Sequence, residues 1–290
     1  MASDKNMKKR LLLLTLTLLG SALLLNYRSL TIYTTPEVVF QDSKKSIFKE
    51  MEFSSYWRCY QNTDVAPTPN KRFQLLNWNI HKGKDPNWQE DLKKFTKKKD
   101  FVLLQEATSR QQISDLLSQF ENSLHIFAFQ YQQQKSGILN LSHLDADRYC
   151  LNGSQEPLLR LPKLMSAMRF PFENGQSLLV INVHLINFDW TNHSYQKQLD
   201  GLKVLIQQHQ GAVILAGDFN TWNEKRKAKL LELTNDLQLA EVQIIPDIRT
   251  TVFGYPLDYI FTRDIIVHSA TSYTVKSSDH NPLELDFSLK

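Results

Sequence analysis

The chain has 290 residues, of which 42% are apolar and 22% are charged, the composition of an ordinary globular protein. These values exclude collagen-like and low-complexity chains, and two cysteines are too few for a disulfide framework or a cysteine-rich metal cluster. The net charge is +4, but residues 73–290 carry 23 basic and 24 acidic side chains. So neutral a body argues against a protein that binds nucleic acid by bulk charge.

The N-terminus has the pattern of an export signal. An uncharged run, Leu11–Leu25, follows four cationic side chains: Lys5, Lys8, Lys9 and Arg10. As a helix this run would span about 22 Å, less than the roughly 30 Å of a hydrocarbon core. We favour an uncleaved signal anchor over residues 1–27, with a cleaved signal peptide as the alternative. The cationic side stays in the cytoplasm, which predicts an inner-membrane or exported protein whose body lies outside the cytoplasm.

The body divides into a stem and one folded domain. Residues 28–71 show no sustained hydrophobic period and contain VAPTPN, which predicts a stem and lead-in. A catalytic domain is expected over residues 72–290. Its hydrophobic periods predict strands at 72–80, 101–105, 124–131, 137–142, 164–172, 177–184, 212–216, 257–262, 267–275 and 283–287, with helices at 88–98, 110–120, 195–208 and 224–235. So many strands with four helices predict an α/β fold in four layers, two packed mixed sheets flanked by helices.

Polar side chains gather at the ends of these apolar strands, in the order NWN, QE, NVHLIN, GDFN, LDY and SSDHNP. Such positions converge over one edge of a sheet. Oxygen ligands of this kind suit Mg²⁺ or Mn²⁺, and histidines beside aspartates supply acid and base chemistry on a phosphate ester. The candidate residues are Asn79, Glu106, His184, Asn187, Asp218, Asn220, Asp258, Asp279 and His280.

Each candidate alone has a simpler interpretation, since Asp and Asn after a strand are usually turn formers or helix caps. A single histidine is more often a hydrogen-bonded core residue. Only the joint occurrence of the motifs favours catalysis. Arg160 and Lys163 are either phosphate contacts or part of a solvated loop, and the lysine run at 93–99 is interpreted as a solvated helix face.

The order of these motifs resembles the endonuclease/exonuclease/phosphatase superfamily, whose fold is DNase I-like, over residues 73–290. Within the superfamily the chain looks most like the bacterial YafD family, through EPLLRLPK at 156–163, VINVHLINF, GDFNTW at 217–222 and SSDHNPL at 277–283. The resemblance implies a divalent-metal-dependent hydrolase of phosphate esters.

The resemblance also implies a metal site. Glu106 matches the main metal ligand, with Asn79 and Asp279 beside it, and Asn187 matches an asparagine that contacts the phosphate. His81 stands where abasic-site endonucleases tend to carry an acid. We therefore expect one metal ion, Mg²⁺ or Mn²⁺.

The remaining roles follow the same resemblance. Asp218 and Asn220 match the pair that orients the attacking water and the scissile phosphate. His280 matches the histidine that contacts the phosphate or acts as base, and Asp258 the acid that orients it. His184 matches a phosphate ligand or a proton donor to the leaving group.

Three functions stay open at this point. The first is a nuclease-like phosphodiesterase that uses metal-assisted water attack. The alternatives are a phosphodiesterase or phosphatase acting on phospholipids or their head groups at the membrane, and a catalytically inactive phosphate-binding module. Expected partners are a phosphate-ester substrate, either nucleic acid or a phospholipid head group, and the membrane through the N-terminal segment; no protein partner can be inferred.

Cys59 and Cys150 allow two interpretations. Both would lie in an oxidising compartment if the body is exported, where they can form a disulfide. The sequence does not show that their Cα atoms approach within about 7 Å, so two unpaired buried thiols are the expectation we favour.

Overall fold

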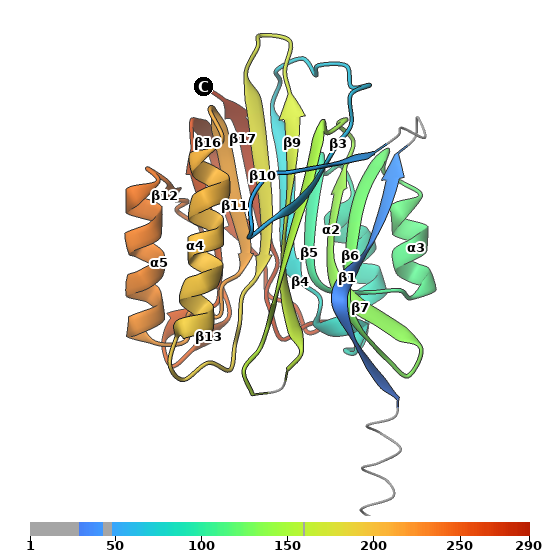
Figure 1. Ribbon diagram of the computed structural model, residues 1–290, viewed down its shortest axis with the longest axis vertical. Helices are drawn as coiled ribbons and strands as arrows, with labels where there is room; N and C mark the ends of the chain where they lie inside the picture. The colour runs from blue at the N-terminus through green and yellow to red at the C-terminus, as the bar shows by residue number, and fades with distance from the viewer. Residues whose placement is uncertain (1–28, 43–47, 159) are drawn as a thin grey trace, which may run out of the picture.

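The computed structural model describes residues 29–42, 48–158 and 160–290, which form two sheets packed face to face with helices on the outside (Figure 1). This arrangement confirms the expected pair of mixed sheets flanked by helices. The expected signal anchor at 1–27 lies outside the described residues. In the part of the chain that is described, no helix has the length and apolar character needed to cross a membrane.

The first sheet has seven strands in the order β1-β6-β7-β5-β4-β17-β16. Its strands are β1 (Leu30–Asp42), β4 (Phe73–Asn79), β5 (Phe101–Thr108), β6 (Asn122–Tyr131), β7 (Gln134–Ser142), β16 (Ile265–Ser272) and β17 (Leu283–Leu289). β4 and β5 are parallel, with Asn79 opposite Gln105. The continuous apolar run of β5 is typical of a strand covered on both faces, and its first five residues are buried.

The second sheet has eight strands in the order β12-β15-β11-β10-β9-β8-β3-β2. Its strands are β2 (Lys49–Met51), β3 (Arg58–Gln61), β8 (Arg148–Gln155), β9 (Pro162–Pro171), β10 (Ser177–His184), β11 (Ala212–Asp218), β12 (Ala240–Glu241) and β15 (Asp258–Arg263). β10 and β11 are parallel and end together, since His184 lies opposite Asp218. A short hairpin, β13 (Thr251–Val252) with β14 (Tyr255–Pro256), precedes β15.

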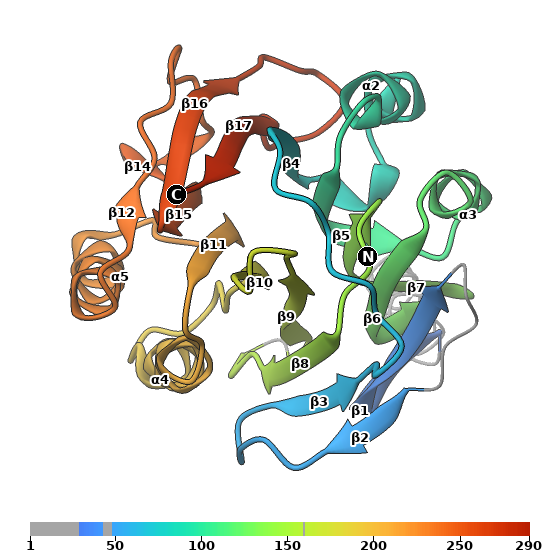
Figure 2. The ribbon, with the colours of Figure 1, turned by 90° about the horizontal axis from the view of Figure 1, so that it is seen from above.

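Helices cover the outer face of each sheet (Figure 2). The 3₁₀ turn η1 (His81–Gly83), α2 (Trp88–Thr96) and α3 (Gln111–Leu117) belong to the seven-stranded side, while α4 (His193–Gln207) and α5 (Glu224–Asp236) cover the eight-stranded sheet. α4 buries Tyr195, Leu199 and Leu202, which share one helical face. The two inner faces enclose a core that contains Phe73, which packs edge-on against its neighbour Phe101.

The expectation of a stem over residues 28–71 is wrong for much of that segment. β1 pairs with β6 along most of its length, from Leu30 opposite Tyr131 to Asp42 opposite Asn122. β2 and β3 extend the other sheet at its edge. These strands pair with residues far away in the sequence and are only partly buried, so no local hydrophobic period indicates them. The strand at 148–155, β8, was not predicted from the sequence either.

The expectation of two unpaired thiols is also wrong. Cys59 on β3 lies directly opposite Cys150 on β8, and the two form a disulfide. Their Cα atoms are 4.1 Å apart. The short distance follows from the antiparallel register of β3 and β8, which the sequence does not reveal because β3 itself was not predicted.

Candidate active site

Asp218, the last residue of β11, lies at the centre of a cluster of side chains at one end of the sandwich. Three groups approach its Oδ2 atom: Asn79 Nδ2 donates a hydrogen bond at 3.1 Å, His184 Nε2 lies at 3.4 Å and His280 Nε2 at 3.9 Å. The other carboxyl oxygen, Oδ1, accepts a hydrogen bond from the Asn220 backbone at 3.0 Å. The structure thus brings together five of the predicted residues, contributed by both sheets.

The local sequence GDFN explains how Asp218 reaches this position. Gly217 has φ 145°, and a Cβ atom there would lie 2.0 Å from the carbonyl oxygen of Val183 on β10. Only glycine permits this approach of the two strands. Asn220 follows with φ 49°, a conformation that asparagine tolerates, and its Nδ2 donates to the carbonyl oxygen of Leu185. The turn therefore fixes Asp218 and Asn220 against the end of β10.

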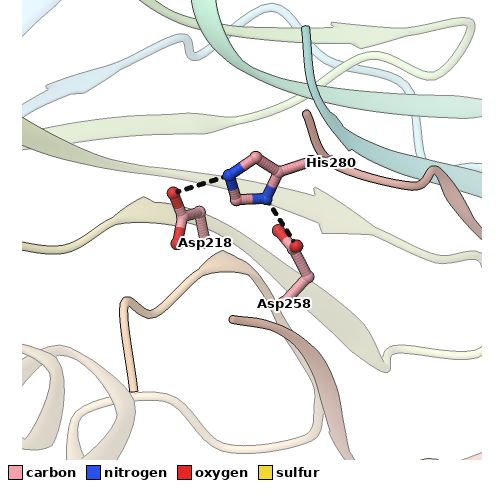
Figure 3. Close-up of side chains that lie close together, drawn as sticks. All are labelled: Asp218, Asp258 and His280. Carbon is pink, nitrogen blue, oxygen red and sulfur yellow. Dashed lines mark hydrogen bonds and ion pairs between the residues drawn. The ribbon is translucent and has the colours of Figure 1, made fainter. Parts of the chain in front are cut away.

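His280 is held by Asp258 (Figure 3). The His280 Nδ1 atom lies 2.7 Å from Asp258 Oδ2, and both side chains are buried. Burial lowers the pKa of His280, but the carboxylates of Asp258 and Asp218 outweigh it and raise the pKa to about 10. The imidazole is therefore positively charged at neutral pH, which suits contact with a phosphate oxygen better than the role of a base.

Burial and neighbouring charges shift the pKa values of Asp218 and His184 in opposite directions. Burial raises the pKa of Asp218, His280 lowers it and Asp258 raises it again, which leaves it at about 6. Burial and the neighbouring Lys163 hold the pKa of His184 well below its ordinary value. His184 is thus neutral, and its Nε2 atom accepts a hydrogen bond from Lys163 Nζ at 2.7 Å. A neutral imidazole does not fit the expected role of proton donor, but it fits that of a ligand.

Glu106 lies at a β-bulge where β5 pairs with β7, between Gln105 and Ala107. Its φ is 55°, a left-handed conformation that residues other than glycine rarely adopt and that is found at functional sites. Burial raises the pKa of Glu106, but the cationic side chains around it, Lys82 and Lys163, lower it to about 2. The carboxylate is ionised and forms an ion pair with Lys82.

The chemistry of the donors fits a hard divalent cation. Glu106 supplies an ionised carboxylate, and the Asn79 side chain lies at the adjacent strand end, where its Oδ1 atom accepts a bond from the His81 backbone. Asp279 lies farther out, with its side chain 58% exposed and Oδ1 3.7 Å from His81 Nδ1. A second group of side chains that could hold a metal ion consists of Asp218, Asp258 and His280, whose ligand atoms lie within 4.8 Å of one another.

A cavity of about 230 Å³ opens beside this cluster. Glu106, His184 and Asn187 line it, together with Lys82 and Lys163. The cavity therefore joins three of the predicted residues to two cationic side chains, a combination that suits an anionic ligand. Of the two interpretations of Lys163, the structure supports contact with the site.

Lys82, Glu156 and Arg226 are functional candidates that the sequence did not indicate. Lys82 follows the end of β4 by three residues, so its place near the same sheet edge was the available signal. Glu156 Oε1 accepts the backbone N–H groups of Asn187 and Phe188, both at 2.9 Å. Glu156 therefore holds the loop after β10, which borders the cavity.

Arg226 lies in the first turn of α5, on the face that buries Leu230 and Leu233. Its position four and seven residues before the buried Leu230 and Leu233 was the available signal. The guanidinium is fully buried and donates to the carbonyl oxygens of Ile186 at 2.6 Å and Asn220 at 3.0 Å. Arg226 therefore connects the loop after β10 to the GDFN turn.

Comparison with known proteins agrees with this geometry. A model of the Endonuclease/Exonuclease/phosphatase family matches residues 76–280. The UPF0294 protein of Vibrio parahaemolyticus is 34% identical over 262 residues, which cover 89% of this chain and 91% of that protein.

Two solved structures share the fold at low identity. Mannosyl-6-phosphatase of Bacteroides thetaiotaomicron is 14% identical, with a TM-score of 0.58 over 74% of this chain and 99% of that one. TDP2 of D. rerio, in complex with a single-strand DNA product, is 16% identical, with a TM-score of 0.53 over 75% of this chain and 99% of the other.

The chain belongs to the Endonuclease/Exonuclease/phosphatase family, whose members are phosphoric ester hydrolases. Within that family its relatives are the UPF0294 proteins, which form the YafD family. This confirms the resemblance inferred from the order of the sequence motifs.

Proposed function

We propose that the protein is a divalent-metal-dependent phosphodiesterase that hydrolyses its substrate by direct attack of water. The convergence of Asn79, His184 and His280 on one oxygen of Asp218, next to the ionised Glu106, carries this proposal. Such a cluster combines a carboxylate that accepts a proton with several groups that bind phosphate oxygens.

In the proposed reaction, Asp218 accepts a proton, and His280 and Lys163 stabilise negative charge. The water oxygen forms a bond to phosphorus and its proton goes to Asp218, whose pKa of about 6 suits a base near neutral pH. The bond between phosphorus and the leaving oxygen breaks, and that oxygen takes a proton from water. His280 and Lys163 carry positive charge toward the phosphate, which stabilises the negative charge that develops on its oxygens.

Glu106 and Asn79, with Asp279 nearby, would hold Mg²⁺ or Mn²⁺. When bound, such an ion neutralises charge on the phosphate oxygens. Lys82 forms an ion pair with Glu106, so it neutralises the same carboxylate that we propose as a ligand of the metal ion.

The location of the domain is part of the proposal. We place it outside the cytoplasm, tethered to the inner membrane by residues 1–27. The cationic residues before Leu11–Leu25 support this orientation, and so does the disulfide between Cys59 and Cys150, because disulfides persist in oxidising compartments. An alkaline phosphatase fusion at Lys290 tests it, since that reporter is active only outside the cytoplasm; an inactive fusion that is expressed in full contradicts the orientation.

Hydrolysis of bis-p-nitrophenyl phosphate by the purified full chain tests the activity. We expect release of p-nitrophenol with Mg²⁺ or Mn²⁺ and none in excess EDTA.

His280→Ala should lower the rate about 10²- to 10⁴-fold. The matched control is His268→Ala, because His268 is exposed on β16 and its Nε2 atom lies 3.0 Å from Ser288 Oγ. Equal rates in the two variants, or activity in EDTA, would contradict the proposal. Faster release from p-nitrophenyl phosphate would indicate a phosphomonoesterase instead.

A further inference from the structure

Exposed apolar side chains gather at the end of the sandwich that holds the site, which we call the catalytic end. Three of the most exposed large apolar side chains among the described residues are Phe253, Trp190 and Leu158, at 83%, 78% and 64%. We call these three residues the apolar rim. Exposed apolar side chains clustered around a site often mark a surface that binds a protein or a membrane.

The topology places all three residues at the catalytic end. Trp190 follows β10, which ends at His184 opposite Asp218. Leu158 precedes β9, which is antiparallel to β10 and therefore begins at that end. Phe253 lies at the tip of the β13–β14 hairpin, just before β15 begins at Asp258, opposite Asp218.

A second cavity, of about 450 Å³, extends the first one. Leu30, Phe129, Tyr131 and Leu161 give it apolar walls, and Lys84 and Arg110 add positive charge. The two cavities share four lining residues: Lys82, Phe129, Ser136 and Leu161. We call this second cavity the groove. A phosphate bound beside Glu106 would thus lie next to the groove, which has apolar walls and two cationic side chains.

The chain enters the domain at this same end. Leu30, the first residue of β1, pairs with Tyr131 at the end of β6, and both line the groove. Only four residues separate Leu30 from Leu25, the last residue of the apolar run. Five peptide steps span at most about 18 Å. If the run anchors the protein as proposed, the catalytic end faces the bilayer at close range.

We infer that the substrate is a membrane phospholipid, which binds with its phosphate at the site and with its acyl chains in the groove. This inference depends on the proposed phosphodiesterase function. The apolar rim inserts into the interface of the bilayer, where tryptophan and phenylalanine are favoured. Hydrolysis adds one water across a P–O bond, which leaves the phosphate on one product and gives the other a hydroxyl group.

Charge favours a lipid over a nucleic acid as the substrate. Residues 73–290 carry no net excess of basic side chains, whereas proteins that track a nucleic-acid backbone present a basic stripe. The cations near the site, Lys82, Lys84 and Arg110, line the cavities themselves. Because these cations lie in the cavities, they can contact a single phosphate group but do not form a surface for a long polyanion.

The test uses the full chain reconstituted into vesicles of phosphatidylethanolamine, phosphatidylglycerol and cardiolipin, with Mg²⁺. Phospholipid loss is measured by mass spectrometry, and hydrolysis of bis-p-nitrophenyl phosphate is measured in the same samples. We expect the wild type to consume lipid. The double variant Trp190→Ser/Phe253→Ser should consume it at least about tenfold more slowly, a change equivalent to 1.4 kcal/mol. Its hydrolysis of the soluble ester should be unchanged, which also shows that it is folded.

The matched control is Ile266→Ser/Val267→Ser, which removes two exposed apolar side chains, 45% and 39% exposed, near the start of β16. That strand begins at the opposite end, because Ile265 pairs with Leu289 at the end of β17. The control should consume lipid at the wild-type rate, and Tyr131→Glu in the groove should not.

The outcomes separate the two proposals. Hydrolysis of the soluble ester without any loss of lipid overturns the inference, and cleavage of plasmid DNA in that case would identify a nuclease. Equal loss of lipid in the rim variant and the control also overturns it. If the soluble ester itself is not hydrolysed, the proposed function fails and the inference fails with it.

Discussion

Replacing Arg226 with methionine tests whether the site depends on one buried cation. Arg226 donates to the carbonyl oxygens of Ile186, Asn187 and Asn220 at 2.6–3.0 Å, and to Asn192 Oδ1 at 3.1 Å. Methionine keeps an unbranched apolar stem but donates no hydrogen bond, so these four acceptors lose a charged donor. Removing one member of such a buried polar cluster costs about 3–5 kcal/mol. We therefore expect Arg226→Met to lower the free energy of unfolding by about that amount.

Activity should also fall, because these carbonyl groups belong to the loop after His184 and to the GDFN turn. At a temperature where the variant is folded, we expect kcat/KM for bis-p-nitrophenyl phosphate to drop at least about tenfold, which corresponds to 1.4 kcal/mol of lost positioning. Urea unfolding and steady-state kinetics measure the two effects. Arg263→Met is the control, since Arg263 also donates to carbonyl oxygens but pairs with Val213 at the far end of β11. An unchanged kcat/KM in folded Arg226→Met would refute the role in positioning.

Three further predictions follow from the site and the core. Glu106→Ala should abolish stimulation of activity by Mg²⁺ while circular dichroism shows an intact fold; full stimulation would contradict its role as metal ligand. Asp258→Asn should lower kcat less than His280→Ala, and the double variant should lose less than the product of both, since the two act as a pair. Burial holds the pKa of His125 at about 3, below about 6.5 in the unfolded chain, so acid protonates the unfolded state first. The contribution of His125 should thus be complete above pH 6.5 and fall toward pH 3 by about 1.4 kcal/mol per pH unit. In urea unfolding His125→Phe should lose this part of the slope and keep the part due to His209, whose pKa burial lowers to about 4.

Local sequence patterns predicted the central elements well. The continuous apolar run of β10 ends at His184, as expected, and α5 begins at Glu224, directly after an asparagine whose side chain caps it. Such elements carry their own signal, a hydrophobic period with a cap or a polar end. Their order then indicates which strand ends meet.

The edges of the two sheets were not predictable in this way. β1 has exposed and half-buried residues in no regular alternation, and its register shifts between Ile32 and Glu37. β3 is four residues long. Strands of this kind depend on pairing with distant residues, so the sequence of the strand alone does not predict them. The disulfide between Cys59 and Cys150 was missed for the same reason.

Within the site, the sequence indicated the residues at strand ends but not their cationic neighbours. Asp218 and His280 occur in short motifs, so their order along the chain was informative. Lys82 and Arg226 reach the site from a turn and from a helix, where a basic residue normally faces solvent. Their contacts with Glu106 and with the loop carbonyls appear only once both sheets are packed.

The packing of the sheets also explains why the site lies where it does. Gln105, the residue before Glu106, is fully buried and donates from Nε2 to Asn77 Oδ1 at 2.9 Å and to Asn182 Oδ1 at 2.7 Å. Asn77 is on β4 and Asn182 on β10, so this side chain joins the two sheets in the layer directly below the site. Hydrogen bonds between buried carboxamides favour a single register between the sheets, whereas apolar side chains permit sliding. The bulge at Glu106 and the end of β10 at His184 are therefore held in one relative position, which is the condition for a site assembled from both sheets.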